Sequence, residues 1–225
     1  MRVGSLLGIL SGLFLMGIGH GEELWVVEQD FVKFGKKEVF EKSKKELLDA
    51  SGKTFLTFAA QEDDLLQYVF FICVKNFRGL GNFLESADPA NSDVRALYSS
   101  TLNFLVRSLD AYLPECSSVP KGKEALTAYS HISFYLFGIT PGNEEIFEAQ
   151  LQKVASEQAE KTCFRSWKIL MGSDAPKYFV AVFADGEKQA KKSAEEIEFV
   201  PFSMKSILRS KKMGKAVLRK DLSRS

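Results

Sequence analysis

Few residues in this sequence have side chains suited to catalysis or metal binding. It has two histidines, His20 and His131, and three cysteines, Cys73, Cys116 and Cys163. One histidine lies in an N-terminal apolar segment and the cysteines are far apart, so no zinc-ligand spacing is present. A Ser-His-Asp triad would have to use His131, and the Gly-x-Ser-x-Gly turn of such enzymes is absent. The sequence therefore predicts no catalytic set and no metal centre.

Two other stretches come close to a binding motif. Gly79 to Asn82 follows an apolar run and opens a helical stretch, as a phosphate loop would, but Leu84 stands where the third glycine belongs. The acids Glu62, Asp63 and Asp64 are adjacent, whereas a calcium loop needs alternating oxygen ligands. Neither stretch predicts a cofactor, and we expect none to be bound.

Aromatic side chains near a cation are the remaining candidates for a site. They lie in runs that are typical of strands, and such a combination suits a flat, apolar ligand. Simple packing in a core is the alternative interpretation. The candidate ligand contacts inside the fold are Trp25, His131, Tyr135, Arg165 and Trp167.

The N-terminal residues predict a signal peptide. A single cation, Arg2, precedes the apolar run Leu6 to Ile18, and small residues at Gly19 and Gly21 suit a signal peptidase. We expect cleavage after residue 21 and export to the periplasm or the medium. An uncleaved anchor is the alternative, although the apolar run is shorter than the roughly 20 residues that span a bilayer.

The remaining chain predicts the same series of elements twice. Runs rich in β-branched and aromatic residues read as strands, and apolar residues at helical spacing read as helices. The first series is strand 24–33, helix 38–50, strands 54–60 and 67–75 and helix 79–86, followed by a long helix over 94–113. The second is strand 131–139, helix 144–160, strands 163–170 and 178–183 and helix 187–196, followed by a helix over 202–217.

The two series overlay residue by residue. Four pairs occur in the same order, at separations of 107 to 110 residues: Gly35 with Gly142, Phe40 with Phe147, Phe55 with Phe164, and Tyr68 with Tyr178. Self-similarity at a fixed period indicates repeated structural units. We predict a tandem duplication with one repeat over residues 22–127 and a second over residues 128–225.

Each repeat predicts a ferredoxin-like α+β sheet with helices on one face. The first and third strands would be parallel neighbours, and the bare face of one sheet would pack on that of the other. The stretches VKFGKKEVFE and ITPGNEEIFE, each at the end of a strand, resemble the opening of dimeric α/β-barrel proteins. These include antibiotic-biosynthesis-monooxygenase-like and NIPSNAP-like domains, and the resemblance covers residues 24–86 and 131–200.

The resemblance implies a barrel made within one chain and leaves its activity open. The superfamily holds enzymes, haem-handling proteins and members without assigned activity. If a haem were bound, the resemblance would make His131 its ligand, although no motif around it supports that role. Pairing of two chains and a monomeric barrel are both compatible with the pattern.

Charge is nearly balanced overall and uneven along the chain. The formal net charge is +1, which predicts no general attraction to nucleic acid. Residues 203–225 carry eight cations against Asp221 alone. We interpret this segment as the basic helix and strand that close the second repeat. A cationic surface for anionic membranes is the alternative.

These observations favour an exported, non-catalytic barrel that binds a small ligand or a protein. The first alternative is a cofactor-independent monooxygenase or haem-linked oxidoreductase in the same barrel. The second is a cationic, envelope-associated protein.

Overall fold

The computed structural model describes residues 23–51, 55–62, 65–85, 92–122, 125–171 and 176–223. The predicted signal peptide, residues 1–21, lies outside these residues, and so do Asp63 and Asp64. In the part of the chain that is described, no helix is long and apolar enough to cross a bilayer.

The described residues form two series of elements in the predicted order. The first consists of β1 (Leu24–Val32), α1 (Lys37–Ser51), β2 (Phe55–Glu62), β3 (Leu65–Lys75), α2 (Phe77–Glu85), α3 (Ser92–Ser100) and β4 (Leu102–Tyr112). The second consists of β5 (His131–Ile139), α4 (Glu144–Glu157), β6 (Cys163–Met171), β7 (Lys177–Ala184), α5 (Glu187–Glu196) and β8 (Leu208–Leu218).

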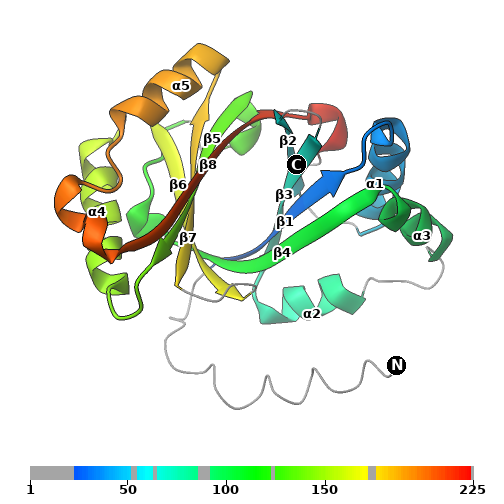
Figure 1. Cartoon of the computed structure of the whole chain (residues 1–225), viewed down its shortest axis with the longest axis horizontal. Coiled ribbons are helices and arrows are strands. Elements are labelled where there is room, and N and C mark those ends of the chain that lie inside the picture. The colour runs from blue at the N-terminus through cyan, green and yellow to red at the C-terminus, as the bar shows by residue number, and fades with distance from the viewer. Residues whose placement is uncertain are drawn as a thin grey trace.

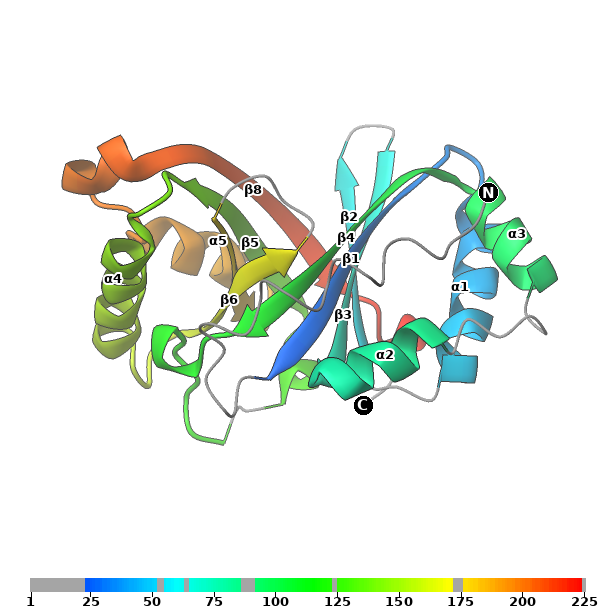
Figure 2. The ribbon, with the colours of Figure 1, turned by 90° about the horizontal axis from the view of Figure 1, so that it is seen from below.

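The strands close into one barrel in the order β1-β3-β2-β8-β5-β7-β6-β4. Helices α1 and α3 lie on one side of the barrel and α4 and α5 on the opposite side (Figure 1), an arrangement that the perpendicular view repeats (Figure 2). The order within each series is the same, β4-β1-β3-β2 and β8-β5-β7-β6.

All strand pairs are antiparallel, so the prediction that the first and third strands are parallel neighbours is wrong. Helix α1 carries the chain back to the end where β1 began, and β2 therefore runs in the same direction as β1 without touching it. The hairpin then returns β3 between the two, antiparallel to both.

The two predicted long helices, 94–113 and 202–217, are also wrong. The first ends at Ser100 and continues as β4, and the basic segment forms a short 3-10 helix η5 (Phe202–Ile207) and then β8 rather than a closing helix. Both strands gain hydrogen bonds from a neighbour along most of their length: β4 from β1 and β8 from β5. Such tertiary pairing outweighs helix propensity.

Three apolar cores fill the molecule. One fills the barrel, with side chains from strands of both series, and the other two lie between the sheet and the outer helices of each series. Successive residues of a strand face opposite sides, so each strand contributes to the barrel core and to one outer core. The side chain of a strand residue is thereby either inside the barrel or under the helices.

The predicted residue pairs make matching contacts in the two series. The Phe40 ring lies 4.7 Å from that of Tyr68, and Phe147 lies 4.8 Å from Tyr178, measured between ring centres. Gly35 and Gly142 both have a positive φ, 71° and 86°, at the turn into the first helix of their series. Glycine adopts such a φ without the steric cost that a Cβ brings to other residues.

The end of each series packs on the other one. The short 3-10 helix η3 (Pro114–Cys116) lies on β6, where the Ser166 hydroxyl donates to the Cys116 carbonyl at 2.7 Å. Its counterpart η6 (Lys220–Leu222) lies on β2, where Thr57 donates to the Leu222 carbonyl. Arg219 also forms an ion pair with Glu41 of α1. The two series are therefore interlocked.

Replacing Gly214 of β8 with alanine is expected to destabilise the protein by about 1–3 kcal/mol. An added Cβ would overlap the ring of Phe134 inside the barrel. Gly81 of α2 is a matched control, since a Cβ there meets nothing within 4 Å, and Gly81→Ala should be neutral or slightly stabilising. Urea unfolding of both variants measures the difference. Equal stability of the two variants would contradict the tight packing of β8 on Phe134.

Candidate functional site

A cavity of about 680 Å³ opens at one end of the barrel. It lies where β1 and β2 begin and β3 ends, and the start of α2, residues 125–127 and Arg165 of β6 complete its wall. This volume is in the range of pockets that bind small organic molecules.

The cavity has an apolar floor and a charged rim. Trp25, Leu56 and Phe71 line it and also belong to the barrel core. Its lining includes three cations and one acid, namely Lys75, Arg78, Arg165 and Glu23. The net charge of the lining therefore favours a ligand with an anionic group.

Both tryptophans of the chain lie inside the barrel. The rings of Trp25 and Trp167 meet edge to face with their centres 6.2 Å apart, and Trp167 is fully buried. Neither indole N–H has a hydrogen-bond partner among the described residues. A buried donor without a partner costs roughly 1–3 kcal/mol, so both N–H groups would gain from an acceptor placed beside them.

Asp110 is a buried acid in the same interior. It lies on β4 directly across from Trp25 of β1, with 0% of its surface exposed. Its neighbours Leu109 and Ala111 face the outer core, which places the Asp110 side chain in the barrel. Neither carboxyl oxygen makes a well-formed hydrogen bond to a described residue. Burial raises the pKa of Asp110 to about 7, and Ser108 opposes that rise only in part.

Cys73 contributes a thiol to the cavity wall. Its Sγ donates to the Glu23 carboxylate at 3.0 Å. Burial raises the pKa of the thiol to about 11, and the bond to Glu23 acts in the same direction. The thiolate is the nucleophilic form, so Cys73 is a lining group rather than a nucleophile at neutral pH.

Comparison with solved structures identifies the architecture. A predicted monooxygenase from Fusobacterium nucleatum has a TM-score of 0.67 at 11% identity, over 90% of this chain and 94% of its own. An anthrone oxidase-like protein has a TM-score of 0.64 at 9% identity, over 89% and 92%. A predicted chlorite dismutase has a TM-score of 0.55 at 10% identity, over 89% and 97%.

The chain has the dimeric α/β-barrel fold. No protein-family model matches the sequence, and no curated protein matches it significantly. At these identities the likeness concerns the fold alone, because one fold carries many chemistries.

Three of the five sequence-predicted contact residues point into the α/β barrel. Trp25 and Arg165 line the cavity and Trp167 lies deeper in the core. His131 and Tyr135 do not join them. They alternate along β5 with Ile132 and the other interior residues, and Tyr135 belongs to the outer core under α4 and α5.

The position of His131 does not fit a haem in the barrel. Its side chain shares the outward face of β5, and its Nδ1 lies 2.8 Å from the Ser130 hydroxyl. No other described residue is a histidine. We therefore derive no chemistry through a histidine-bound haem.

The sequence did not predict Asp110 as a site residue, because Asp110 falls within the helix predicted over residues 94–113. The signal that was available is a strand pattern in LNFLVRSLDAY, in which Ser108, Asp110 and Tyr112 alternate with Leu109 and Ala111.

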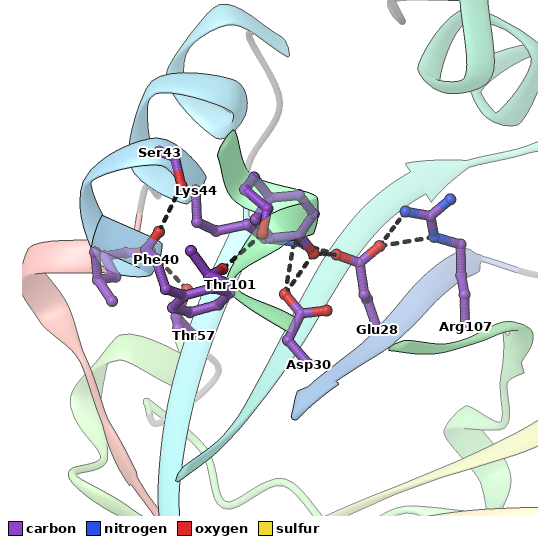
Figure 3. Close-up of polar contacts among 10 residues, drawn as sticks. Glu28, Asp30, Phe40, Ser43, Lys44, Thr57, Thr101 and Arg107 are labelled. Atoms are coloured by element: carbon purple, nitrogen blue, oxygen red, sulfur yellow. Dashed lines mark hydrogen bonds and ion pairs between the residues drawn. The ribbon is translucent and has the colours of Figure 1, made fainter. Parts of the chain in front are cut away.

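A second polar cluster lies outside the barrel, under α1 and α3 (Figure 3). Glu28 and Asp30 of β1 both form ion pairs with Lys44 of α1, at 3.0 Å between Lys44 Nζ and Asp30 Oδ2. Arg107 of β4 binds Glu28 through two nitrogens, and Nε donates at 2.7 Å. The Tyr98 hydroxyl of α3 donates to Asp30 at 2.8 Å. We call these five residues the charged cluster.

Burial raises the pKa values of the two acids of the charged cluster, and pairing with cations lowers them. Burial alone would raise the pKa of Glu28, but Lys44 and Arg107 together outweigh it and hold the pKa at about 2. Burial raises the pKa of Asp30 to about 6, against the attraction of Lys44. Asp30 Oδ1 has no hydrogen-bond partner in the described residues.

The second series has apolar or uncharged residues at the matching places. Glu28 pairs with Phe70 and Arg107, and at the matching positions Tyr135 pairs with Val180 and Met213. Asp30 lies opposite Tyr68, as Phe137 lies opposite Tyr178. On the first helix, Lys44 corresponds to Leu151, four residues after Phe147. The second series therefore packs its first helix on the sheet without buried charges at these positions.

Proposed function

We propose that this barrel binds a small, flat, largely apolar molecule with a carboxylate or similar anionic group in its end cavity. The observation that carries the proposal is the presence of Arg165 beside aromatic residues in the cavity wall. The guanidinium of Arg165 lies 5.7 Å from the centre of the Tyr112 ring. A planar cation held beside aromatic rings suits a carboxylate on an aromatic scaffold.

Replacing Arg165 with methionine is expected to weaken binding of 2-naphthoate at least tenfold, because a charge-assisted hydrogen bond contributes about 1.5–3 kcal/mol. Isothermal titration calorimetry measures the affinity, and tryptophan fluorescence reports on the cavity because Trp25 lines it.

Two controls accompany this measurement. Lys211→Met removes a cation from the outer face of β8, where Lys211 lies 5.2 Å from the Tyr135 ring centre, and should leave binding unchanged. Naphthalene lacks the carboxylate and should bind wild type and Arg165→Met alike. Equal affinity of both variants for 2-naphthoate would contradict the role of Arg165, and no binding by wild type would contradict the proposed function.

A second candidate function is cofactor-independent oxidation of the bound molecule. It is supported by the names of the structural neighbours and by Asp110, an acid with a pKa of about 7 in an apolar interior. A general base is most effective with a pKa near the working pH. Asp110 would take a proton from an activated CH2 group, which O2 then converts to a carbonyl with release of one water. Oxygen uptake with anthrone, compared with Asp110→Asn, tests this.

We also propose that the two series arose by tandem duplication, with repeats over 22–127 and 128–225. We propose further that the signal peptide is cleaved after residue 21 and that the mature chain is exported. The matching ring contacts and turn glycines support the duplication. Mass spectrometry of the mature N-terminus tests the export.

The basic segment offers a cationic face for a membrane. Arg209, Lys211, Met213 and Lys215 are exposed along β8. Strand β8 also closes the barrel between β2 and β5, so the basic segment has a structural role. We therefore favour the ligand-binding function over membrane association.

A further inference from the structure

Four buried polar atoms in the barrel make no well-formed hydrogen bond to a described residue. They are the indole nitrogens of Trp25 and Trp167 and both carboxyl oxygens of Asp110. The side chains around them are almost all apolar. Buried polar groups are paired in most proteins, so a cluster of unpaired ones calls for a ligand or ordered water.

One of the three residues, Trp25, lines the cavity, and Asp110 and Trp167 are buried beside it in the barrel. On β1, Trp25 stands between two cross-strand neighbours: Cys73 of β3, which lines the cavity, and Asp110 of β4. Trp167 contacts Trp25 edge to face. Trp25 thus stands between the cavity wall and Asp110 in the sheet, and a ligand that displaces its ring would meet all three polar groups.

Arg165 and Asp110 mark the two ends of this path. On the inward face of β6, Arg165 is followed by Trp167 and then by Ile169, which pairs with Asp110. Four residues of extended strand cover roughly 13 Å. The arginine side chain takes up part of this backbone distance between Arg165 and the level of Asp110. A rigid molecule of two fused rings, with polar groups at opposite ends, matches the distance that is left.

The donor and acceptor types select the group that fits the inner end. The indole N–H groups only donate, so the ligand must offer an acceptor. Above about pH 7 Asp110 is ionised and only accepts, so at such a pH the ligand must also offer a proton. An ammonium group has no acceptor and a second carboxylate has no proton to donate. A hydroxyl group has both.

We propose that Asp110 and the indole N–H groups of Trp25 and Trp167 form an inner site for the hydroxyl group of a hydroxy-aromatic acid, whose carboxylate lies at Arg165. This inference rests on the proposed function, since the same cavity holds the rest of the molecule. The hydroxyl donates to Asp110 and accepts from an indole N–H. The inner site thereby distinguishes hydroxylated from plain aromatic acids.

Calorimetry with three probes tests the inner site. Wild type should bind 6-hydroxy-2-naphthoate about tenfold or more tightly than 2-naphthoate, because an acidic partner strengthens the added hydrogen bond. In 3-hydroxy-2-naphthoate the hydroxyl is beside the carboxylate and cannot reach Asp110, so this probe should gain nothing. The pattern distinguishes a site at the inner end from a general effect of a hydroxyl group.

Two variants complete the test. Asp110→Leu keeps a similar volume without an acceptor, and it should abolish the preference for the 6-hydroxy compound. Asp110→Asn still accepts a hydrogen bond but carries no charge, and it should keep a smaller preference. Far-ultraviolet circular dichroism confirms that each variant is folded.

The outcomes separate the two proposals. If wild type binds 2-naphthoate but shows no preference for the 6-hydroxy compound, or if Asp110→Leu keeps the preference, the inner site is overturned and the proposed function stands. If wild type binds none of the probes, the proposed function is overturned and the inner site with it.

Discussion

Replacing Lys44 with methionine is expected to lower the free energy of unfolding by about 3–5 kcal/mol at neutral pH. The substitution keeps the length of the side chain but removes the ammonium that pairs with Glu28 and Asp30. Both acids are buried, with 1% and 0% of their surface exposed. Removing one partner of a buried ion pair leaves an uncompensated charge, which is far more costly than the net contribution of the intact pair. Urea unfolding at pH 7 measures the loss.

Two further variants show whether the loss comes from uncompensated charge. Lys45→Met removes the adjacent lysine, which is about half exposed and pairs with Asp49 at 3.5 Å, and should change stability by less than about 0.5 kcal/mol. Adding Glu28→Gln and Asp30→Asn to Lys44→Met removes the stranded charges and should restore part of the stability. A loss for Lys44→Met no larger than for Lys45→Met would mean that water reaches the charged cluster.

Comparison with the second series indicates that the charged cluster does more than stabilise the fold. Tyr135, Phe137 and Leu151 fill the matching space with apolar contacts, and the ring of Tyr135 stacks with Phe137 at 5.7 Å. Apolar packing of similar volume is often as stable as a buried ion network. In the first series the cluster instead fixes α3, which has no buried residue of its own, because Tyr98 binds the acids of β1. Charge here specifies where an extra helix docks.

The sequence predicted the first strands and helices of each series because their patterns are local. The bounds of β5 and α5 agree with the prediction, and Gly35 and Gly142 identified the two equivalent turns. Runs such as HISFYLFGI are apolar on both faces, however, so alternation could not tell the inner face from the outer one. For this reason the sequence pattern predicts the same face for His131, Tyr135 and Trp25, whereas His131 and Tyr135 face the helices.

The burial of Lys44 and Asp110 could not be predicted from the sequence, because it depends on contacts with residues far away in the chain. Lys44 lies in a run of lysines and glutamates that is typical of a solvated helix face, and its burial follows from Glu28 and Asp30 on a distant strand. The leucines at helical spacing around Asp110 predict a helix there. Its place in the barrel comes from pairing with β1 and β6, which no local pattern contains.

Replacing Asp110 with asparagine is expected to change the dependence of stability on pH. Burial raises the pKa of this acid from an ordinary value of 3.8 to about 7. Between these values the folded protein holds a proton that the unfolded chain has lost. The contribution of Asp110 to stability is therefore fully present below about pH 4, and it is lost as pH rises to about 7. The slope is ~1.4 kcal/mol per pH unit.

The difference between wild type and Asp110→Asn isolates this effect. Asparagine does not titrate, so wild type should lose stability relative to the variant from pH 4 to pH 7 and run parallel to it above pH 8. Glu28, with a pKa of about 2, and Asp30, with a pKa of about 6, titrate in both proteins, and their contributions cancel in the difference because distant sites are additive. Urea unfolding at pH 4.5, 6 and 8 measures the change. A difference that is constant with pH would show that Asp110 ionises as it does in water.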